Sequence, residues 1–168
     1  MREYTRVQTA IANLPYSLML LTGAAVITWG FGFSPWALIG AASYIAYGIG
    51  GALWIMVFIC PCCSYYDTRG CPCGYGRLAA RIVPKSNKEC FAEKFKRHIP
   101  AIVPLWLIPL GCGAVALWRD LSPRTAWLLG VFVLNSFVIL PLVSRRHACH
   151  ECPQKDDCPW MGKSRAPS

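Results

Sequence analysis

Four long runs without a charged residue dominate the hydrophobic pattern of the chain. They cover residues 14–33, 36–59, 99–118 and 126–143, and none of them contains Asp, Glu, Lys or Arg. A helix needs about 20 apolar residues to cross a hydrocarbon core about 30 Å thick, and each run is of that length. The pattern therefore predicts an all-α membrane protein with four transmembrane helices in an up-down bundle. Four buried helices of a soluble domain are disfavoured, because so many uncharged runs fall in a chain of only 168 residues.

The polar segments between these runs divide the chain into five predicted parts. They are an N-terminal tail (1–13), a first transmembrane hairpin (14–59), a Cys-rich loop (60–98), a second hairpin (99–143) and a Cys-rich C-terminal tail (144–168). The first run is too long for a signal peptide and lacks a clear cleavage site of small residues. The expected fold is thus a bundle with the loop and tail as a cap.

Two shorter patterns refine this picture. Residues 86–98 predict a short amphipathic helix on the membrane surface, with Ser86 and Glu89 forming a capping box. In the second run, Ala42, Ala46 and Gly50 recur every four residues. Small residues at that spacing allow helices to approach closely. We expect this face to pack inside the bundle, with a dimer interface as the alternative.

Basic residues lie almost entirely on one side of the predicted membrane. Fifteen of the 17 Lys and Arg residues fall in the two tails and the 60–98 loop, and only Arg119 and Arg124 fall on the other side. Because Lys and Arg are enriched in cytoplasmic loops, the bias predicts a cell (inner) membrane protein with both termini in the cytoplasm. The net charge of +9 follows from this topology and does not indicate nucleic-acid binding. The expected surroundings are a lipid bilayer.

Nine of the ten cysteines share that basic side. Thiols in the cytosol stay reduced, so such a group is more typical of a metal or redox site than of a disulfide framework. All nine are candidate metal ligands: Cys60, Cys62, Cys63, Cys71, Cys73, Cys90, Cys149, Cys152 and Cys158. The tenth, Cys112, lies within a predicted span and is expected to be a core thiol.

A small repeat in the loop suggests how the ligands are arranged. Cys60-Pro61-Cys62 recurs as Cys71-Pro72-Cys73, and two such pairs can supply the four thiolates of a zinc ion or a four-iron cluster. We therefore expect these four sulfurs to converge on one point, with the tail cysteines beside them. Cys149, Cys152 and Cys158 make an incomplete second set, which His147, His150, Cys63 or Cys90 can complete. Cys-Pro pairs favour a [4Fe–4S] cluster, with zinc as the alternative.

The sequence is compatible with four functions. The first is an electron-transfer subunit that holds iron–sulfur clusters at the membrane surface and docks with a redox partner protein. The second is a structural zinc module for docking a partner. The third is handling or transport of soft metal ions, since four spans with cysteine pairs resemble the layout of mercuric-ion uptake proteins. The fourth is thiol–disulfide exchange with quinone. No nucleophile–base pair, phosphate loop or paired carboxylates appear, so we do not expect catalysis by this chain alone.

Overall fold

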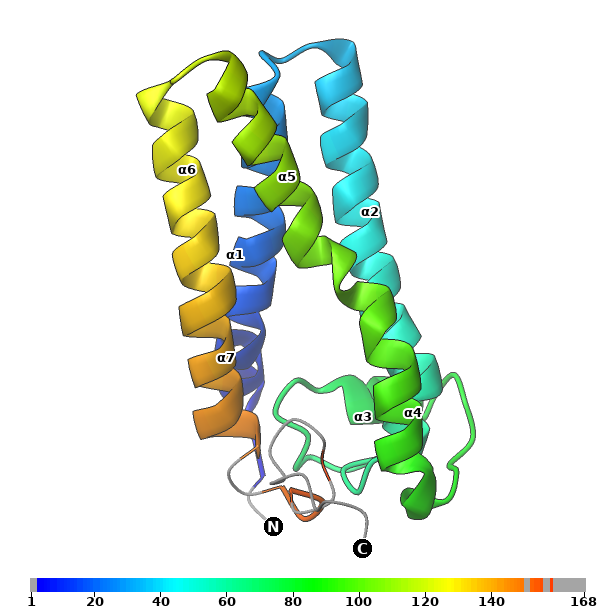
Figure 1. The fold of residues 1–168 in the computed structure, drawn as a ribbon. Helices are drawn as coiled ribbons and strands as arrows, with labels where there is room; N and C mark the ends of the chain where they lie inside the picture. The colour runs from blue at the N-terminus through cyan, green and yellow to red at the C-terminus, as the bar shows by residue number, and fades with distance from the viewer. Residues whose placement is uncertain (1–2, 150–151, 156–157, 159–168) are drawn as a thin grey trace, which may run out of the picture. The chain divides into compact units, whose positions relative to one another are not determined.

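All regular structure in the described part of the protein is helical. The computed structural model describes residues 3–149, 152–155 and 158, with the backbone alone for 147–149 (Figure 1). Four helical stretches are long and apolar enough to cross a membrane, namely Arg6–Gly30, Pro35–Cys62, Lys88–Arg119 and Pro123–Arg146. The predicted all-α membrane fold with four spans is confirmed.

Prolines and polar segments mark the ends of the helices. The elements are α1 (Arg6–Gly30), α2 (Pro35–Phe58), η1 (Cys60–Cys62), α3 (Tyr75–Ala79), η2 (Lys88–Cys90), α4 (Phe91–His98), η3 (Ile99–Ile102), α5 (Pro104–Arg119), α6 (Pro123–Leu134), η4 (Asn135–Ile139), α7 (Leu140–Val143) and η5 (Ser144–Cys149). The label η denotes a 3₁₀ helix in η1, η2 and η3 and a π-helix in η4 and η5. Helices α2, α5 and α6 each begin at a proline, whose missing N–H is not needed in the first turn. Pro100 lies in η3, a short 3₁₀ segment that separates α4 from α5.

The chain forms two compact units. The bundle unit comprises residues 14–51 and 102–141, and the cap unit comprises 1–13, 52–101 and 142–168. The bundle unit thus holds most of the four apolar runs. The cap unit gathers both tails, the Cys-rich loop and the last turns of α2, so all nine candidate cysteine ligands belong to one unit.

The bundle unit is held by close helix contacts and a few buried hydrogen bonds. Met19 and Leu105 are fully buried, and the Tyr44 hydroxyl donates to the Leu105 carbonyl at 3.0 Å. The absence of a side chain at Gly23 makes room for the ring of Tyr44, because a Cβ there would lie 2.6 Å from the Tyr44 hydroxyl oxygen. The tyrosine therefore links the first three helices of this unit.

The small-residue face of α2 differs from expectation. Ala42, Ala46 and Gly50 are exposed, while Ala41 and Gly48 are buried. The buried face includes Tyr44, whose large ring requires small neighbours on that side of the helix. The expectation that the Ala42–Ala46–Gly50 face packs inside the bundle is wrong.

The fourth span contains a π-helical segment at its only polar pair. Asn135 and Ser136 are buried, and the Asn135 side-chain amide donates to the Pro15 carbonyl at 2.9 Å. The Trp106 indole donates to the Ser136 carbonyl at 3.3 Å. A single wide turn of this type shifts the register of a helix and re-aims its side chains. Here it presents both residues to neighbouring helices.

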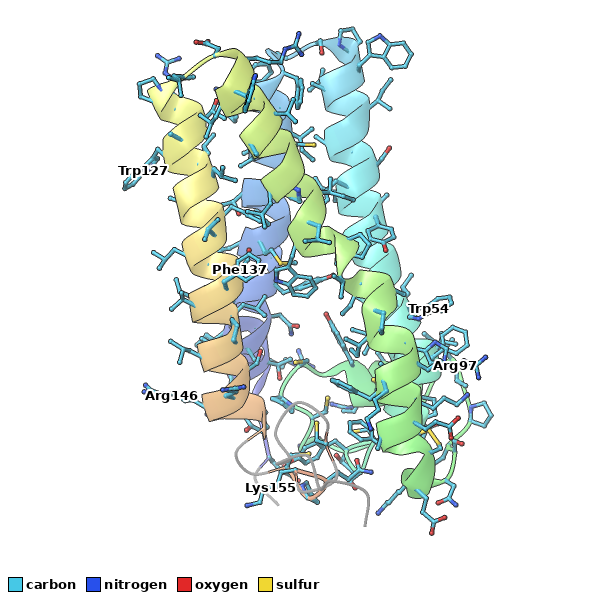
Figure 2. The ribbon with its side chains drawn as sticks, in the orientation of Figure 1. Trp54, Arg97, Trp127, Phe137, Arg146 and Lys155 are labelled. Atoms are coloured by element: carbon cyan, nitrogen blue, oxygen red, sulfur yellow. A yellow bond between two sulfur atoms is a disulfide. The ribbon has the colours of Figure 1, made fainter. Side chains whose placement is uncertain are left out.

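The outward surface of the bundle unit is apolar. Trp127 points away from the helices (Figure 2), with 75% of its surface exposed, and Phe137 is 49% exposed. Trp36 and Trp118, also highly exposed, occur at the start of α2 and the end of α5. Tryptophan is enriched where a bilayer meets water. This surface is therefore suited to lipid.

The amphipathic helix of the loop forms, but its cap is not the predicted one. Helix α4 follows a 3₁₀ turn whose N-cap is Asn87, and the Asn87 side chain accepts a hydrogen bond from the Glu89 N–H. Asn87 rather than Ser86 therefore begins this helical stretch. Phe91 and Phe95 lie on one face of α4, with ring centroids 5.7 Å apart.

Candidate thiol cavity

Six cysteines line one cavity of about 220 Å³ in the cap unit. Four come from the loop and two from the tail: Cys60, Cys63, Cys71, Cys73, Cys152 and Cys158. All six are free thiols. Most of the remaining wall is apolar or aromatic, including Ile59, Phe91 and Phe95, and Lys155 is the one charged side chain among its described residues. Segments about 90 residues apart thus bring their sulfurs to a common space.

The first loop cysteines are set by a tight turn at the end of α2. Residues Cys60–Cys62 form the 3₁₀ segment η1, and the Cys63 N–H donates to the Cys60 carbonyl at 3.0 Å. Pro61 is buried, and its carbonyl accepts from the Ser86 N–H at 3.0 Å. Cys60 therefore follows directly from a membrane-spanning helix and is held on both sides by backbone hydrogen bonds.

The second pair of loop cysteines depends on two glycines. Gly74 has a left-handed backbone with φ of 74°, which glycine adopts without a steric penalty. Gly76 packs so closely against the Tyr65 carbonyl that a Cβ would collide with it. The Gly76 N–H donates to the Cys71 sulfur at 3.4 Å. Hydrogen bonds of this kind stabilise charge on a sulfur ligand.

Gln154 attaches the tail to the loop. This side chain is buried, with 8% of its surface exposed. Its Oε1 accepts from the Ser64 N–H at 2.7 Å, and its Nε2 donates to the carbonyls of Cys62 and Lys88 at 3.2 and 3.3 Å. Cys152 and Cys158 lie on either side of it in the sequence. Reasoning from the sequence missed this residue, because a glutamine in a polar tail carries no distinguishing signal.

Cys62 and Cys90 are joined by a disulfide. The sequence predicted reduced thiols and Cys62 as one of the four main ligands. In this structure the two sulfurs bond to each other and neither lines the cavity. The structure places Cys63 on the wall instead. The disulfide packs in a small apolar core with Ile59, Phe91 and Cys158.

The free thiols affect one another electrostatically. Burial raises the pKa of Cys63 to about 11, a backbone hydrogen bond at Tyr65 partly opposes this, and repulsion from Cys71, Cys152 and Cys158 adds to the rise. The pKa of Cys152 is also raised, first by burial. Loop and tail thiols are therefore near enough that the ionisation of one disfavours the ionisation of the others. A bound cation removes that resistance.

The thiols surround a space but do not converge on one point. Among the described residues, no three Cys, His, Asp or Glu side chains are arranged so that they could hold a metal ion. The expected convergence of Cys60, Cys62, Cys71 and Cys73 is thus not found in this conformation. Cys149, His147 and His150 are the remaining candidates, and their side chains lie outside the described part of the chain.

The fold and the cavity define an all-α membrane protein with a thiol-lined cap. No protein-family model matches the chain, and no curated protein or solved structure shows significant similarity to it.

Proposed function

We propose that the cap unit binds an iron–sulfur cluster through its cavity thiols and transfers electrons at the membrane surface. The observation that carries this proposal is the gathering of six free thiols from loop and tail around one largely apolar space. A [4Fe–4S] cluster requires four thiolates, so the cavity offers a full set with two sulfurs to spare. When bound, such a cluster accepts and releases single electrons.

The cavity has room for a cluster. Four sulfurs at about 2.3 Å from one zinc leave no open space between them. A cavity of about 220 Å³ accommodates a polynuclear centre, with inward movement of the thiol side chains to complete its ligation. Most of the wall is apolar, and Lys155 on the same wall is a positive charge near the thiols.

The topology supports a cytoplasmic cap on the inner membrane. Fifteen of the 17 basic residues belong to the tails and the 60–98 loop, and basic residues favour the cytoplasmic side. Cys60 follows α2 directly, so a centre held there lies close in sequence to a membrane-spanning helix. A quinone or a partner protein with its own redox centre is the expected electron donor or acceptor.

Anaerobic purification of the full chain tests this proposal. We expect bound iron and acid-labile sulfide. We also expect a broad absorption band from thiolate-to-iron charge transfer, at about 400 nm, which dithionite bleaches reversibly. Stoichiometric zinc in a colourless protein would instead establish the structural zinc site. Protein without either metal after anaerobic reconstitution would exclude both.

A further inference from the structure

A second cavity in the cap unit is lined by four arginines. It has a volume of about 490 Å³, and its wall includes Arg6, Arg69, Arg77 and Arg81. This volume lies in the usual range for small-molecule sites. The wall also includes Cys71 and Cys73, which line the thiol cavity as well. The two cavities thus share part of the loop that carries the second cysteine pair.

The positive charge of this cavity is largely uncompensated. Within the described part of the chain, the carboxylate nearest to these guanidinium groups is Glu3, whose Oε2 lies 3.9 Å from Arg69 Nη1. Arg6, Arg77 and Arg81 form no ion pair there. Arg77 lies in α3 and Arg81 in the turn just beyond its end, and both line this cavity, so their like charges repel each other. An anion between them relieves this repulsion.

Contacts between the N-terminal segment and the loop hold the cavity together. The Tyr4 N–H donates to the Arg69 carbonyl at 3.0 Å. The Asn13 side chain donates to the carbonyls of Thr9 and Cys73 at 2.9 and 3.1 Å. The bonds to Arg69 and Cys73 join segments about 60 residues apart, so they attach the N-terminal segment to the loop that carries Arg69, Arg77 and Arg81.

We propose that the arginine-lined cavity is a binding site for a phosphate group. The planar guanidinium fork donates two parallel hydrogen bonds to phosphate oxygens, and several arginines together recognise a doubly charged group. The phosphate belongs either to a membrane lipid headgroup or to a soluble phosphorylated molecule. Phosphate binding is proposed independently of metal binding, although Cys71 and Cys73 line both cavities.

Calorimetric titration of inorganic phosphate into the full chain in a neutral detergent tests the site. We expect saturable binding of one phosphate, weakened about tenfold or more by the double variant Arg77→Gln/Arg81→Gln, as expected when two charge-assisted contacts are lost. The matched control Lys85→Gln/Arg97→Gln removes the same charge from the same unit outside the cavity, so binding should change less than about twofold. Arg77→Lys/Arg81→Lys keeps the charge and should fall between wild type and the glutamine variant.

The source of the phosphate is distinguished in nanodiscs. If the ligand is a lipid headgroup, discs of phosphatidylcholine should allow phosphate binding, and discs containing phosphatidic acid should abolish it by occupying the site. Equal binding in both discs indicates a soluble ligand, and either result supports the site. Equal weakening by the Arg77/Arg81 and Lys85/Arg97 glutamine pairs would show general electrostatics and overturn the proposal. Metal loss with unchanged phosphate binding in the Arg77/Arg81 variant would also overturn it, since the arginines then only balance thiolates.

Discussion

The side-chain amide of Gln154 donates to the backbone carbonyl of Cys62 at 3.2 Å, and so connects the C-terminal tail to the turn that follows α2. The same side chain accepts from the Ser64 N–H at 2.7 Å. These contacts place Cys152 and Cys158 beside the loop thiols. The integrity of the thiol cavity therefore depends on a residue that is not itself a candidate ligand.

Replacement of Gln154 should open the tail. Gln154→Leu leaves three backbone groups without their partners, of which the Cys62 carbonyl is buried, and the loss of such a bond costs about 1 kcal/mol. We expect the tail cysteines of the metal-free protein to react with a maleimide at least about tenfold faster, which corresponds to about 1.4 kcal/mol. Lys85→Ala, an exposed change in the same unit, is the control. Unchanged reactivity in Gln154→Leu would mean that the tail is held by other contacts.

The cavity thiols should be needed for metal content. Cys71→Ser, Cys73→Ser, Cys152→Ser and Cys158→Ser each remove a wall thiol, and we expect each to lower iron and sulfide per protein while membrane insertion is retained. Metal contributes folding energy to small metal-dependent domains, so the loop should also become sensitive to protease. Cys112→Ser, in α5 of the bundle unit, should have no effect. The metal proposal fails if all four cap variants keep the full metal content of the wild type.

The redox state of Cys62 and Cys90 in cells should report which side of the membrane the cap unit faces. Cytosolic thiols are kept reduced, so in a cytoplasmic cap both sulfurs should react with an alkylating agent when cells are quenched in acid. After purification in air, the bond should form and protect them. Mass spectrometry of the labelled peptides measures both states. A bond already complete in quenched cells would place the cap on the oxidising side and favour disulfide chemistry there.

The four spans could be predicted from the sequence because the bilayer imposes a simple requirement. A helix in lipid must be apolar along its whole length, so an uncharged run of sufficient length is a signal by itself. The choice of buried face is harder, since nearly every side chain of such a helix is apolar. Ala42, Ala46 and Gly50 therefore indicated the wrong face of α2, which buries Ala41, Tyr44 and Gly48 instead.

The sequence also placed the cysteines in one cap but could not pair them. Cys62 and Cys63 are neighbours, yet Cys62 bonds to Cys90 while Cys63 lines the cavity. Such a difference is set by which way each side chain leaves a 3₁₀ turn. Spacing along the chain does not contain that information. The same is true of Gln154, whose importance comes from three backbone groups that are distant in sequence.

Metal affinity should increase with pH. The pKa of Cys63 is raised to about 11, so at neutral pH this thiol must lose its proton when a metal binds. Apparent affinity for Co²⁺, followed by the thiolate charge-transfer band against a competing chelator, should rise about tenfold per pH unit for each proton released. Affinity that stays constant between about pH 6.5 and 8.5 would show that Cys63 and its neighbours are not ligands.

The metal-free cap should respond to pH in the opposite direction. The pKa of Cys63 is higher in the folded cap unit than in the unfolded chain, so its contribution to the free energy of unfolding is fully present below the unfolded-state pKa. That contribution is lost as the pH rises toward about 11. The protease resistance of the metal-free cap unit should therefore fall as the pH rises through this alkaline range. Cys63→Ala removes the titrating group and should reduce this dependence.

Gly76 should be essential for the second cysteine pair. An alanine Cβ at this position would collide with the Tyr65 carbonyl, and the backbone shift needed to avoid it would break the Gly76 N–H bond to the Cys71 sulfur, now 3.4 Å long. We expect Gly76→Ala to lower metal content as much as Cys71→Ser and to increase cleavage of the loop by protease. The matched control is Gly111→Ala in α5, where no atom lies within 4 Å of the added Cβ. That change should leave metal content unchanged and stabilise its helix slightly, since alanine is the better helix former. Equal metal content in Gly76→Ala and wild type would show that the loop around Cys71 and Cys73 adapts freely, and that its close packing does not set the site.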